Sequence, residues 1–289
     1  MSLTSSGIQA LTTGQIAGFN TSQAAALTAA DLNYFTSTQL QAITTTDVQV
    51  LATATLNGLN STTLGSLATS QVAMLATSQA VSLSATTLNS LAAGSTTNLD
   101  HLTTTDITVL STAVLNGLNS VTLGALTTSQ VAVLTTSQAV GLSGTALNSL
   151  AAGSTTSLQV LTTTDISVLT TATLNGLNSR SLGGLTTAQI SALSTSQVAG
   201  LSGAAVNALA IGSTTNLGVL TTAKIDAIST ATIKGLTTAT ISALTTSQQA
   251  HLTTSQLGAL SATQSAALST TAVAAMSSAQ VGVLLGIGS

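Results

Sequence analysis

An eight-residue repeat runs through almost the whole sequence and leaves few folds open. A new unit begins at Ile8 and at every eighth residue up to Leu88. Within a unit the first and fourth positions (a and d) are mostly apolar, the fifth (e) is mostly Thr, Ser or Asn, and the eighth (h) is often Gln or Asp. Repeats of this kind indicate an array in which each unit is buried by its neighbours, as in solenoid proteins.

Longer units interrupt the octads at a fixed spacing. These eleven-residue units cover residues 88–98, 147–157 and 206–216. One long unit and six octads make a larger repeat of 59 residues, and the motif LNGLNS at Leu56, Leu115 and Leu174 has the same spacing. We therefore predict a single continuous array over residues 1–289, with octads from about residue 8 to residue 284.

The two apolar positions differ in what they tolerate. Position d is apolar in every unit, whereas position a also accepts Ala24, Ala80, Ala139, Gln249 and Ser265. The sequence therefore predicts that position d forms the core and that position a lies at the edge of the buried stripe. The core residues predicted at the centre of the array are Leu126, Leu134, Leu142, Leu185 and Leu193.

The polar positions favour helices over strands. In pairs such as Thr186 and Gln189, the hydroxyl at e can cap a helix while the side chain at h reaches back to the amide of the capping residue. Residues three apart share one face of a helix but lie on opposite faces of a strand. We predict an all-α solenoid of very short capped helices. A β-solenoid is the alternative, because Thr, Val and Ile favour strands and eight is an even period.

Each long unit carries a glycine after its Leu-Ala run. Gly94, Gly153 and Gly212 are predicted to close a helix in the left-handed conformation. The serines that follow are then placed to cap the next helix. They are Ser95, Ser154 and Ser213.

Composition excludes several classes of protein. Charged residues make up 3% of the chain and only three are Lys or Arg, so neither a nucleic-acid partner nor a polybasic membrane anchor is expected. The absence of cysteine excludes disulfides, thiolate metal sites and thiol nucleophiles. No window is apolar enough for a membrane-spanning segment, and no cationic signal peptide is recognised, so any export is expected to use another route.

The acidic residues follow the repeat. Asp31, Asp47, Asp106 and Asp165 stand at position h, where a carboxylate near a helix N-terminus is stabilising. We interpret them as caps. A ladder of carboxylates that binds calcium is the alternative, although the glycine-rich nonapeptide of calcium-binding β-rolls is absent.

No other residues form a recognisable catalytic or metal-binding motif. Asp100 and His101 are adjacent and His251 stands far away, but no Cys or Glu accompanies them as in zinc sites, and no Ser lies in a G-x-S-x-G motif. We expect no enzyme, no cofactor and no metal. Asn20 and Asn60 match the N-glycosylation pattern, yet both stand at capping positions.

The repeat resembles a known class of sequence. LTTAQISAL, LTTSQVAVL and LTTTDISVL are similar to the LTTAQ-type repeats of large bacterial surface or secreted proteins, which are often described as adhesin-like or as haem utilisation or adhesion proteins. The resemblance implies an extracellular or cell-surface location and an adhesive or structural role. It transfers no haem ligand, since His101 and His251 match nothing in the repeat.

These observations lead to a functional hypothesis. We expect a non-enzymatic extracellular structural protein that assembles head-to-tail with itself into a fibre or surface layer, because a solenoid exposes an apolar layer at each end. The alternative is an adhesin segment or stalk that presents Thr and Ser to glycans or a solid surface. The residues assigned to the contact between copies are Phe19, Tyr34, Phe35, Leu284 and Leu285.

Overall fold

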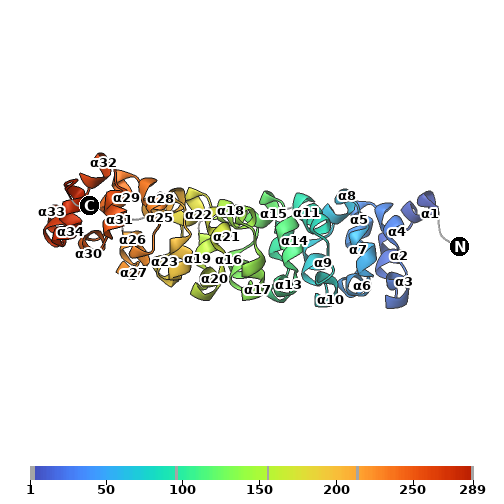
Figure 1. The fold of residues 1–289 in the computed structure, drawn as a ribbon. Coiled ribbons are helices and arrows are strands. Elements are labelled where there is room, and N and C mark those ends of the chain that lie inside the picture. Colours follow the sequence, from blue (N-terminus) through green and yellow to red (C-terminus); the bar gives the residue numbers. More distant parts are fainter. Residues whose placement is uncertain (1–3, 95–96, 155, 213–214, 288–289) are drawn as a thin grey trace. The chain divides into compact units, whose positions relative to one another are not determined.

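The chain folds into short helices throughout its described part. A computed structural model describes residues 4–94, 97–154, 156–212 and 215–287. Within these ranges the regular elements are all α-helices (Figure 1). The all-α prediction is therefore confirmed, and the β-solenoid alternative has no support.

The chain divides into two compact units. The first contains Met1–Leu142 and Ala152–Ser157, and the second contains Ser143–Ala151 and Leu158–Ser289. The helices that lie wholly in the first unit are α1 Ser5–Gln9, α2 Thr13–Ala17, α3 Thr21–Ala25, α4 Ala29–Asn33, α5 Ser37–Ala42, α6 Thr45–Val50, α7 Thr53–Asn57, α8 Ser61–Gly65, α9 Thr69–Ala73, α10 Thr77–Ala80, α11 Ala85–Gly94, α12 Thr97–Asp100, α13 Thr104–Val109, α14 Thr112–Gly117, α15 Ser120–Gly124, α16 Thr128–Ala132 and α17 Thr136–Gly141. Helices α18 Gly144–Gly153 and α19 Thr156–Gln159 contribute residues to both units.

The second unit repeats the same kind of element. Its helices are α20 Thr163–Val168, α21 Thr171–Asn175, α22 Ser179–Gly183, α23 Thr187–Ala192, α24 Thr195–Ala199, α25 Gly203–Gly212, α26 Thr215–Gly218, α27 Thr222–Asp226, α28 Thr230–Lys234, α29 Thr238–Ala243, α30 Thr246–Ala250, α31 Thr254–Gly258, α32 Ala262–Ser265, α33 Thr270–Ala274 and α34 Ser278–Leu284.

Most ordinary octads form one helix that begins at a side-chain cap, as α2 shows. The Thr12 hydroxyl accepts from the Gln15 amide at 3.2 Å, and the Gln15 side-chain oxygen accepts from the Thr12 amide at 2.8 Å. At the other end, the Phe19 amide donates to the Ile16 oxygen at 3.1 Å, and Asn20 then caps the next helix. The predicted capping box is thus present, and the bond from position d back to position a closes each octad.

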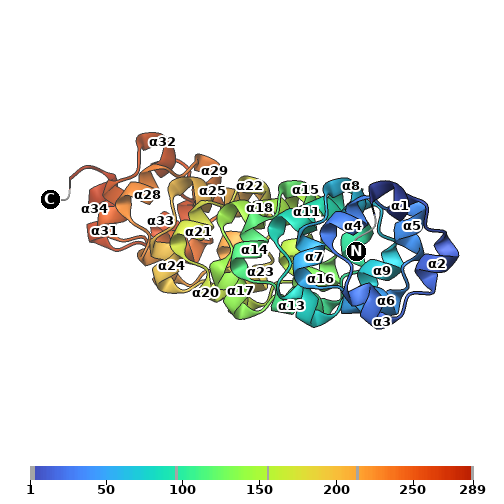
Figure 2. The ribbon, with the colours of Figure 1, turned by 90° about the vertical axis from the view of Figure 1, so that its right-hand side faces the viewer.

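Helices three or four apart in the chain stack to form successive turns. In the first unit α2 packs on α5 and α3 on α6, while α11 contacts both α14 and α15 (Figure 2). In the second unit α25 likewise contacts both α28 and α29. Seven consecutive helices, such as α11 to α17, span one 59-residue repeat, so this repeat makes two turns of three and a half helices each.

The long units make ten-residue helices that do not close as the sequence predicted. The only positive φ angle in the described residues belongs to Gly286, so Gly94 and Gly153 do not adopt the left-handed conformation. Their backbones instead pass against the backbones of Gly65 and Gly124, and a Cβ atom on either Gly94 or Gly153 would overlap its partner. These glycines therefore permit close packing between helices.

The predicted serine caps can be checked at one position. The Ser154 hydroxyl accepts from the Thr156 amide at 3.3 Å, two residues on. Ser95 and Ser213 lie outside the described residues. Gly212 is the last residue of α25.

The prediction about positions a and d needs correction. The residues predicted as core, Leu126, Leu134, Leu142, Leu185 and Leu193, are at most 6% exposed. Position a is buried even more deeply, with Ile16, Ala24 and Ala139 at 0%. Position a lies within the helix, whereas position d follows its end, where the chain turns towards the next cap. Small residues at position a therefore do not mark an edge.

An exchange of residues in the second unit shows how specific the packing is. Position h of the octad before Val273 holds Ala272 instead of Gln. Gln249, at a buried position a, donates to the main-chain oxygens of Ile241 and Leu244 at 3.0 and 3.1 Å and accepts from the Ser269 amide at 2.8 Å. Gln71, at position h, makes the corresponding three bonds, so Gln249 takes the place of the missing side chain.

We predict that a glutamine restored at position 272 can replace the one at position 249. Gln249→Leu should lower the free energy of unfolding by about 1–3 kcal/mol, because it leaves buried main-chain groups unpaired. Adding Ala272→Gln to that variant should recover most of the loss, whereas Ala272→Gln alone should destabilise the protein by overfilling the site. Urea unfolding of the three variants measures the coupling, and additive effects would show that the two positions are independent.

A second prediction concerns the contact between glycines. Gly153→Ala should lower the free energy of unfolding by about 1–3 kcal/mol or more, because the added methyl group meets the Gly124 backbone. Gly14→Ala is the control, since its Cβ would meet no atom closer than the Thr12 hydroxyl oxygen at 4.0 Å, and alanine favours a helix by about 1 kcal/mol. Thermal unfolding should separate the two variants in opposite directions. Similar effects from both would mean that close approach does not explain Gly153.

Candidate functional site

The described residues do not bring together the side chains expected of a metal site. Within them, no three His, Cys, Asp or Glu side chains lie close enough to hold a metal ion. Asp100 and His101 are both exposed. The Nδ1 atom of His251 forms a 2.8 Å hydrogen bond with the main-chain oxygen of Ser247, four residues earlier.

The repeat instead builds a ladder of glutamine side chains between turns. Gln71 is buried, and its Oε1 atom accepts from the Ala68 amide at 2.8 Å, which closes the cap of its own helix. Its Nε2 atom donates to the main-chain oxygens of Leu40 and Ile43, at 2.8 Å each, in the turn before. One amide group therefore both starts a helix and attaches it to the preceding turn.

The same pair of bonds recurs along both units. In each case Nε2 donates to the position a oxygen 31 residues earlier and to the position d oxygen 28 residues earlier. The glutamines that do so are Gln39, Gln71, Gln79, Gln130, Gln138, Gln189, Gln197, Gln248, Gln256 and Gln264. We call this set the glutamine ladder.

Asparagines at the second position of the octad join each turn to the following one. The Nδ2 atom of Asn207 donates to the Gly235 oxygen at 2.9 Å, and its Oδ1 atom accepts from the Thr237 amide at 3.0 Å and the Thr240 hydroxyl at 2.7 Å. Asn89 and Asn148 make the corresponding main-chain bonds at 59-residue spacing. The first Asn of LNGLNS bonds in the same way, since Asn57 donates from Nδ2 to the Ser82 oxygen at 2.8 Å and accepts at Oδ1 from the Ser84 amide at 2.9 Å.

The aspartates at position h act as caps, as the sequence suggested. Asp106 is buried, and its Oδ2 atom accepts from the amide and hydroxyl of Thr103 at 3.0 and 2.6 Å. Its Oδ1 atom accepts from the hydroxyl of Thr77 in the previous turn at 3.1 Å. Asp47 and Asp165 are buried against their own capping threonines, so these carboxylates are used within the fold.

The two matches to the glycosylation pattern are also caps. The Oδ1 atoms of Asn20 and Asn60 accept from the amides of Gln23 and Thr63, at 2.9 Å each. The main-chain amide of Asn60 also donates to the Oδ1 atom of Asn33 at 2.9 Å. Both asparagine side chains are therefore engaged in starting a helix.

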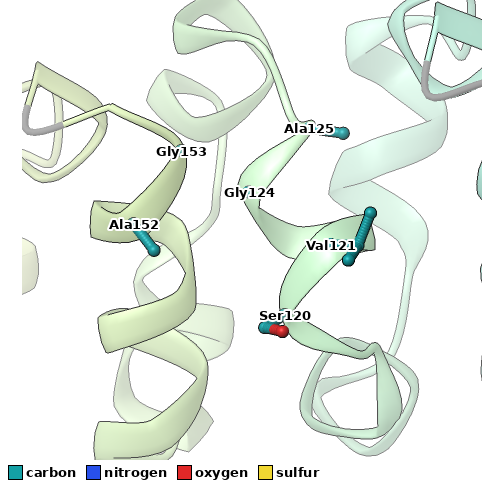
Figure 3. A pocket seen from close by; sticks show the side chains of 6 residues that line it. All are labelled: Ser120, Val121, Gly124, Ala125, Ala152 and Gly153. Carbon is teal, nitrogen blue, oxygen red and sulfur yellow. The ribbon is translucent and has the colours of Figure 1, made fainter.

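The surface carries shallow hollows where the glycine pairs meet. One, of about 400 Å³, is lined by Ser120, Val121, Gly124, Ala125, Ala152 and Gly153 (Figure 3). A hollow of about 330 Å³ is lined by the residues 59 positions earlier, with Thr62 and Ser66 in place of Val121 and Ala125. Neither contains a charged side chain, and both are open to solvent, so they lack the convergent polar groups of a typical small-molecule site.

The residues assigned to a contact between copies differ in exposure. Tyr34 and Leu285 are exposed by 48% and 66%, whereas Phe19 and Leu284 are half-buried. Phe35 lies in the interior of the first unit at 7%. The exposed and half-buried members are therefore those accessible to a partner.

Comparison with known proteins identifies the repeat. Residues 99–136 match the ALTTAQ repeat family. This segment runs from Leu99, across the helices from α12 to α16, and includes Gln130 of the glutamine ladder. The chain is thus a repeat protein with LTTAQ-type repeats. A search of the curated proteins finds no match to the chain.

The length of the helices bears on membrane association. No helix in the described ranges is long and apolar enough to cross a lipid bilayer.

Sequence reasoning identified the capping role of position h but missed the ladder. A Glu would close a capping box as well as a Gln does, yet the sequence contains no Glu. An amide supplies the donor that a carboxylate lacks. The recurrence of Gln in place of Glu at position h therefore indicates that this side chain must also donate a hydrogen bond.

The role of the Nε2 donor of Gln130 can be tested by a substitution that removes this donor and keeps the side-chain oxygen of the cap. Gln130→Glu retains the oxygen that closes the box but leaves the oxygens of Leu99 and Leu102 without their donor, and should cost about 2–4 kcal/mol at neutral pH. Burial beside carbonyl oxygens should raise the pKa of the introduced carboxyl in the folded state. The loss should therefore shrink as the pH falls through that pKa, because protonation restores an O–H donor.

The control for this prediction is Gln49→Glu, which adds the same charge at an exposed position. Urea unfolding of both variants between neutral and acidic pH measures the difference. A loss for Gln130→Glu that does not depend on pH would contradict the role assigned to Nε2.

Proposed function

We propose that this chain is a non-catalytic structural repeat protein that associates end to end with itself into a fibre or surface layer outside the cell. The match to the ALTTAQ repeat family and the turn-to-turn hydrogen bonding support a structural role. The proposal of self-association rests chiefly on one observation, which is that the first turn keeps the side chains of the ladder but exposes them.

The first turn differs from later turns in burial. Gln15 and Gln23 are exposed, whereas Gln39 and Gln71 are buried. The position d residues of the first turn, which are Leu11, Phe19 and Leu27, are only half-buried. An apolar layer and a row of amide donors therefore face outward together at this end of the first unit.

The last helices of the second unit also expose apolar groups. None of the residues of α34 is buried, and Val281 and Leu284 are half-buried. Leu285 and Ile287 beyond them are exposed. Covering such surfaces is favourable, by about 25 cal/mol for each Å² of apolar area removed from water. The net charge of −3 gives little repulsion against association.

A second candidate function is display of a polar surface as an adhesin segment or stalk. The first helical residues of many octads are exposed Thr-Ser pairs, such as Thr128 with Ser129 and Thr195 with Ser196. Hydroxyl groups in rows are suited to hydrogen bonding with glycans or a solid surface. This function would leave the chain monomeric until such a surface is offered.

Light scattering and negative-stain microscopy over a concentration series distinguish these functions. We expect the average mass to rise with concentration and filaments to appear at high concentration. A chain that stays monomeric throughout this range would contradict self-assembly, and binding of that monomer to a glycan array or mineral surface would then support the adhesin function.

A further inference from the structure

We propose that Asn57, Asn116 and Asn175 are sites of spontaneous deamidation, and that each reacts only when the turns that it joins separate. The co-reactant is water, and the products are ammonia and an aspartyl or isoaspartyl residue in place of the asparagine. The sites lie between turns of one chain, so the inference does not depend on the proposed self-association.

Asn-Gly pairs occur at one place in the larger repeat. The sequence contains three of them, all within LNGLNS, at residues 57–58, 116–117 and 175–176. Asparagine is among the thermally labile residues, and a following glycine has no Cβ atom to hinder the approach of its amide nitrogen to the side chain. Three other asparagines hold the same second position of a unit but are followed by Ser or Ala, so they serve as internal controls. They are Asn89, Asn148 and Asn207.

The packing of the turns explains why glycine follows two of these asparagines. A Cβ atom on Gly58 would lie 2.8 Å from the Cβ atom of Ala29 in the preceding turn. A Cβ atom on Gly117 would lie 2.8 Å from that of Ala85. Contacts between carbon atoms are most favourable at about 3.5–4.0 Å, so a larger residue would not fit without a shift. The fold therefore requires, beside the asparagine, the residue type that also makes it reactive.

The reaction begins with attack of the glycine main-chain nitrogen on the Cγ atom of the asparagine. A bond from this nitrogen to Cγ forms, the Cγ–Nδ2 bond breaks, and the proton of the glycine amide leaves with Nδ2 as ammonia. Water then opens the succinimide ring at either carbonyl carbon, which gives aspartate or isoaspartate. Attack therefore requires the glycine amide to leave its helical hydrogen bonds and the side chain to rotate towards it.

In the folded chain the glycines are held in their helical conformation. The Gly58 amide donates to the oxygens three and four residues earlier, at 3.1 and 3.0 Å, and the Gly176 amide does the same at 3.0 Å each. The Gly58 oxygen also accepts from Nδ2 of Asn33 in the preceding turn, at 3.2 Å. The Gly176 oxygen accepts from Nδ2 of Asn148 at 2.9 Å. The nitrogen that would attack is thus already engaged.

The asparagine side chains are held by the following turn. Nδ2 of Asn57 donates to the Ser82 oxygen at 2.8 Å, and its Oδ1 atom accepts from the Ser84 amide at 2.9 Å. Asn116 and Asn175 also donate from Nδ2 to oxygens 25 residues later, at 2.7 and 2.9 Å. The leaving group therefore takes part in the hydrogen bond that joins two turns, and this bond must break before the reaction.

Deamidation would weaken the same joint permanently. A carboxylate accepts hydrogen bonds but does not donate them, so the Ser82 oxygen would lose its donor. Isoaspartate in addition lengthens the main chain by one carbon atom, at the residue where α7 ends. Each event also adds one negative charge to a chain whose net charge is −3. Turns that have once separated would therefore join less firmly afterwards.

Two of the sites differ in one hydrogen bond. The Thr87 hydroxyl donates to Oδ1 of Asn57 at 2.7 Å, in addition to the Ser84 amide. The residue that corresponds to Thr87 beside Asn175 is Ala205. Asn57 should therefore react more slowly than Asn175 in the folded chain.

The first test compares the folded chain with the chain unfolded in guanidinium chloride, both at neutral pH and low protein concentration. Mass spectrometry of peptic peptides measures aspartate and isoaspartate at each asparagine over time. In the unfolded chain, the three Asn-Gly sites should react faster than the internal controls. In the folded chain, their rates should fall at least about tenfold, because opening precedes reaction. Equal rates in the two states would overturn the proposal.

A second measurement distinguishes opening from slow reaction within the closed fold. Urea at concentrations below the unfolding transition should raise the rate at Asn175 in parallel with hydrogen exchange of the Gly176 amide, since both require the turn to open. A deamidation rate that stays constant while this exchange accelerates would mean that the folded chain reacts directly, and the proposal would be wrong.

The variant Thr87→Ala tests the role of the side-chain bonds. The other repeats have Ala146 and Ala205 at this position, so the fold should be retained, which circular dichroism checks. The rate at Asn57 should rise about two- to tenfold, towards that at Asn175, because one hydrogen bond is lost. The rate at Asn175 in the same variant is the control and should not change. An unchanged rate at Asn57 would contradict protection by these bonds.

Discussion

The fold depends on the primary amide of the glutamine at position h. A helix of about five residues is unstable by itself, because nucleation costs more than so few hydrogen bonds return. The Oε1 atom of Gln71 lowers this cost locally by pairing the amide that opens the helix, while Nε2 secures the main-chain oxygens of the turn before. Since both actions belong to one rigid planar group, forming the helix and docking it are coupled. The apolar residues at positions a and d then bury the interior that this coupling aligns.

The places where the glutamine is absent show what the fold requires. Asp106 closes the cap but cannot donate, and its carboxylate instead accepts from Thr77 in the preceding turn. Lys224 occupies position h and donates from Nζ to the Ser191 oxygen at 2.7 Å. Gln249 reaches the same kind of acceptors from position a. No buried side-chain nitrogen or oxygen in the described residues is left without a hydrogen bond. The fold therefore requires that the buried polar side chains between turns are hydrogen-bonded. Several residue types can meet this requirement.

Much of the local structure follows from sequence, because its causes lie within a few residues. Capping pairs three apart, such as Thr186 and Gln189, specify where helices begin, and the helix class and the predicted caps were confirmed. Contacts between turns could not be derived in the same way, because the partner of Gln71 depends on how many helices complete a turn. The complete burial of Ala139 and the close contact between the backbones of Gly153 and Gly124 also depend on how the turns pack. For the candidate site, the residue types could be read from the sequence, whereas only the fold showed that the side chains of Gln15 and Gln23 are exposed.

The half-integral number of helices in a turn staggers each turn against the next. A long helix lies against two helices of the neighbouring turn, as α11 does against α14 and α15. Octads can nevertheless follow one another without a long unit, since ten of them run from Ile8 to Thr87. In that run Gln39, Gln71 and Gln79 all donate to oxygens 31 and 28 residues earlier. Such an array can therefore lengthen by a single octad within a run of octads, whereas the stretch with long units repeats itself only every 59 residues.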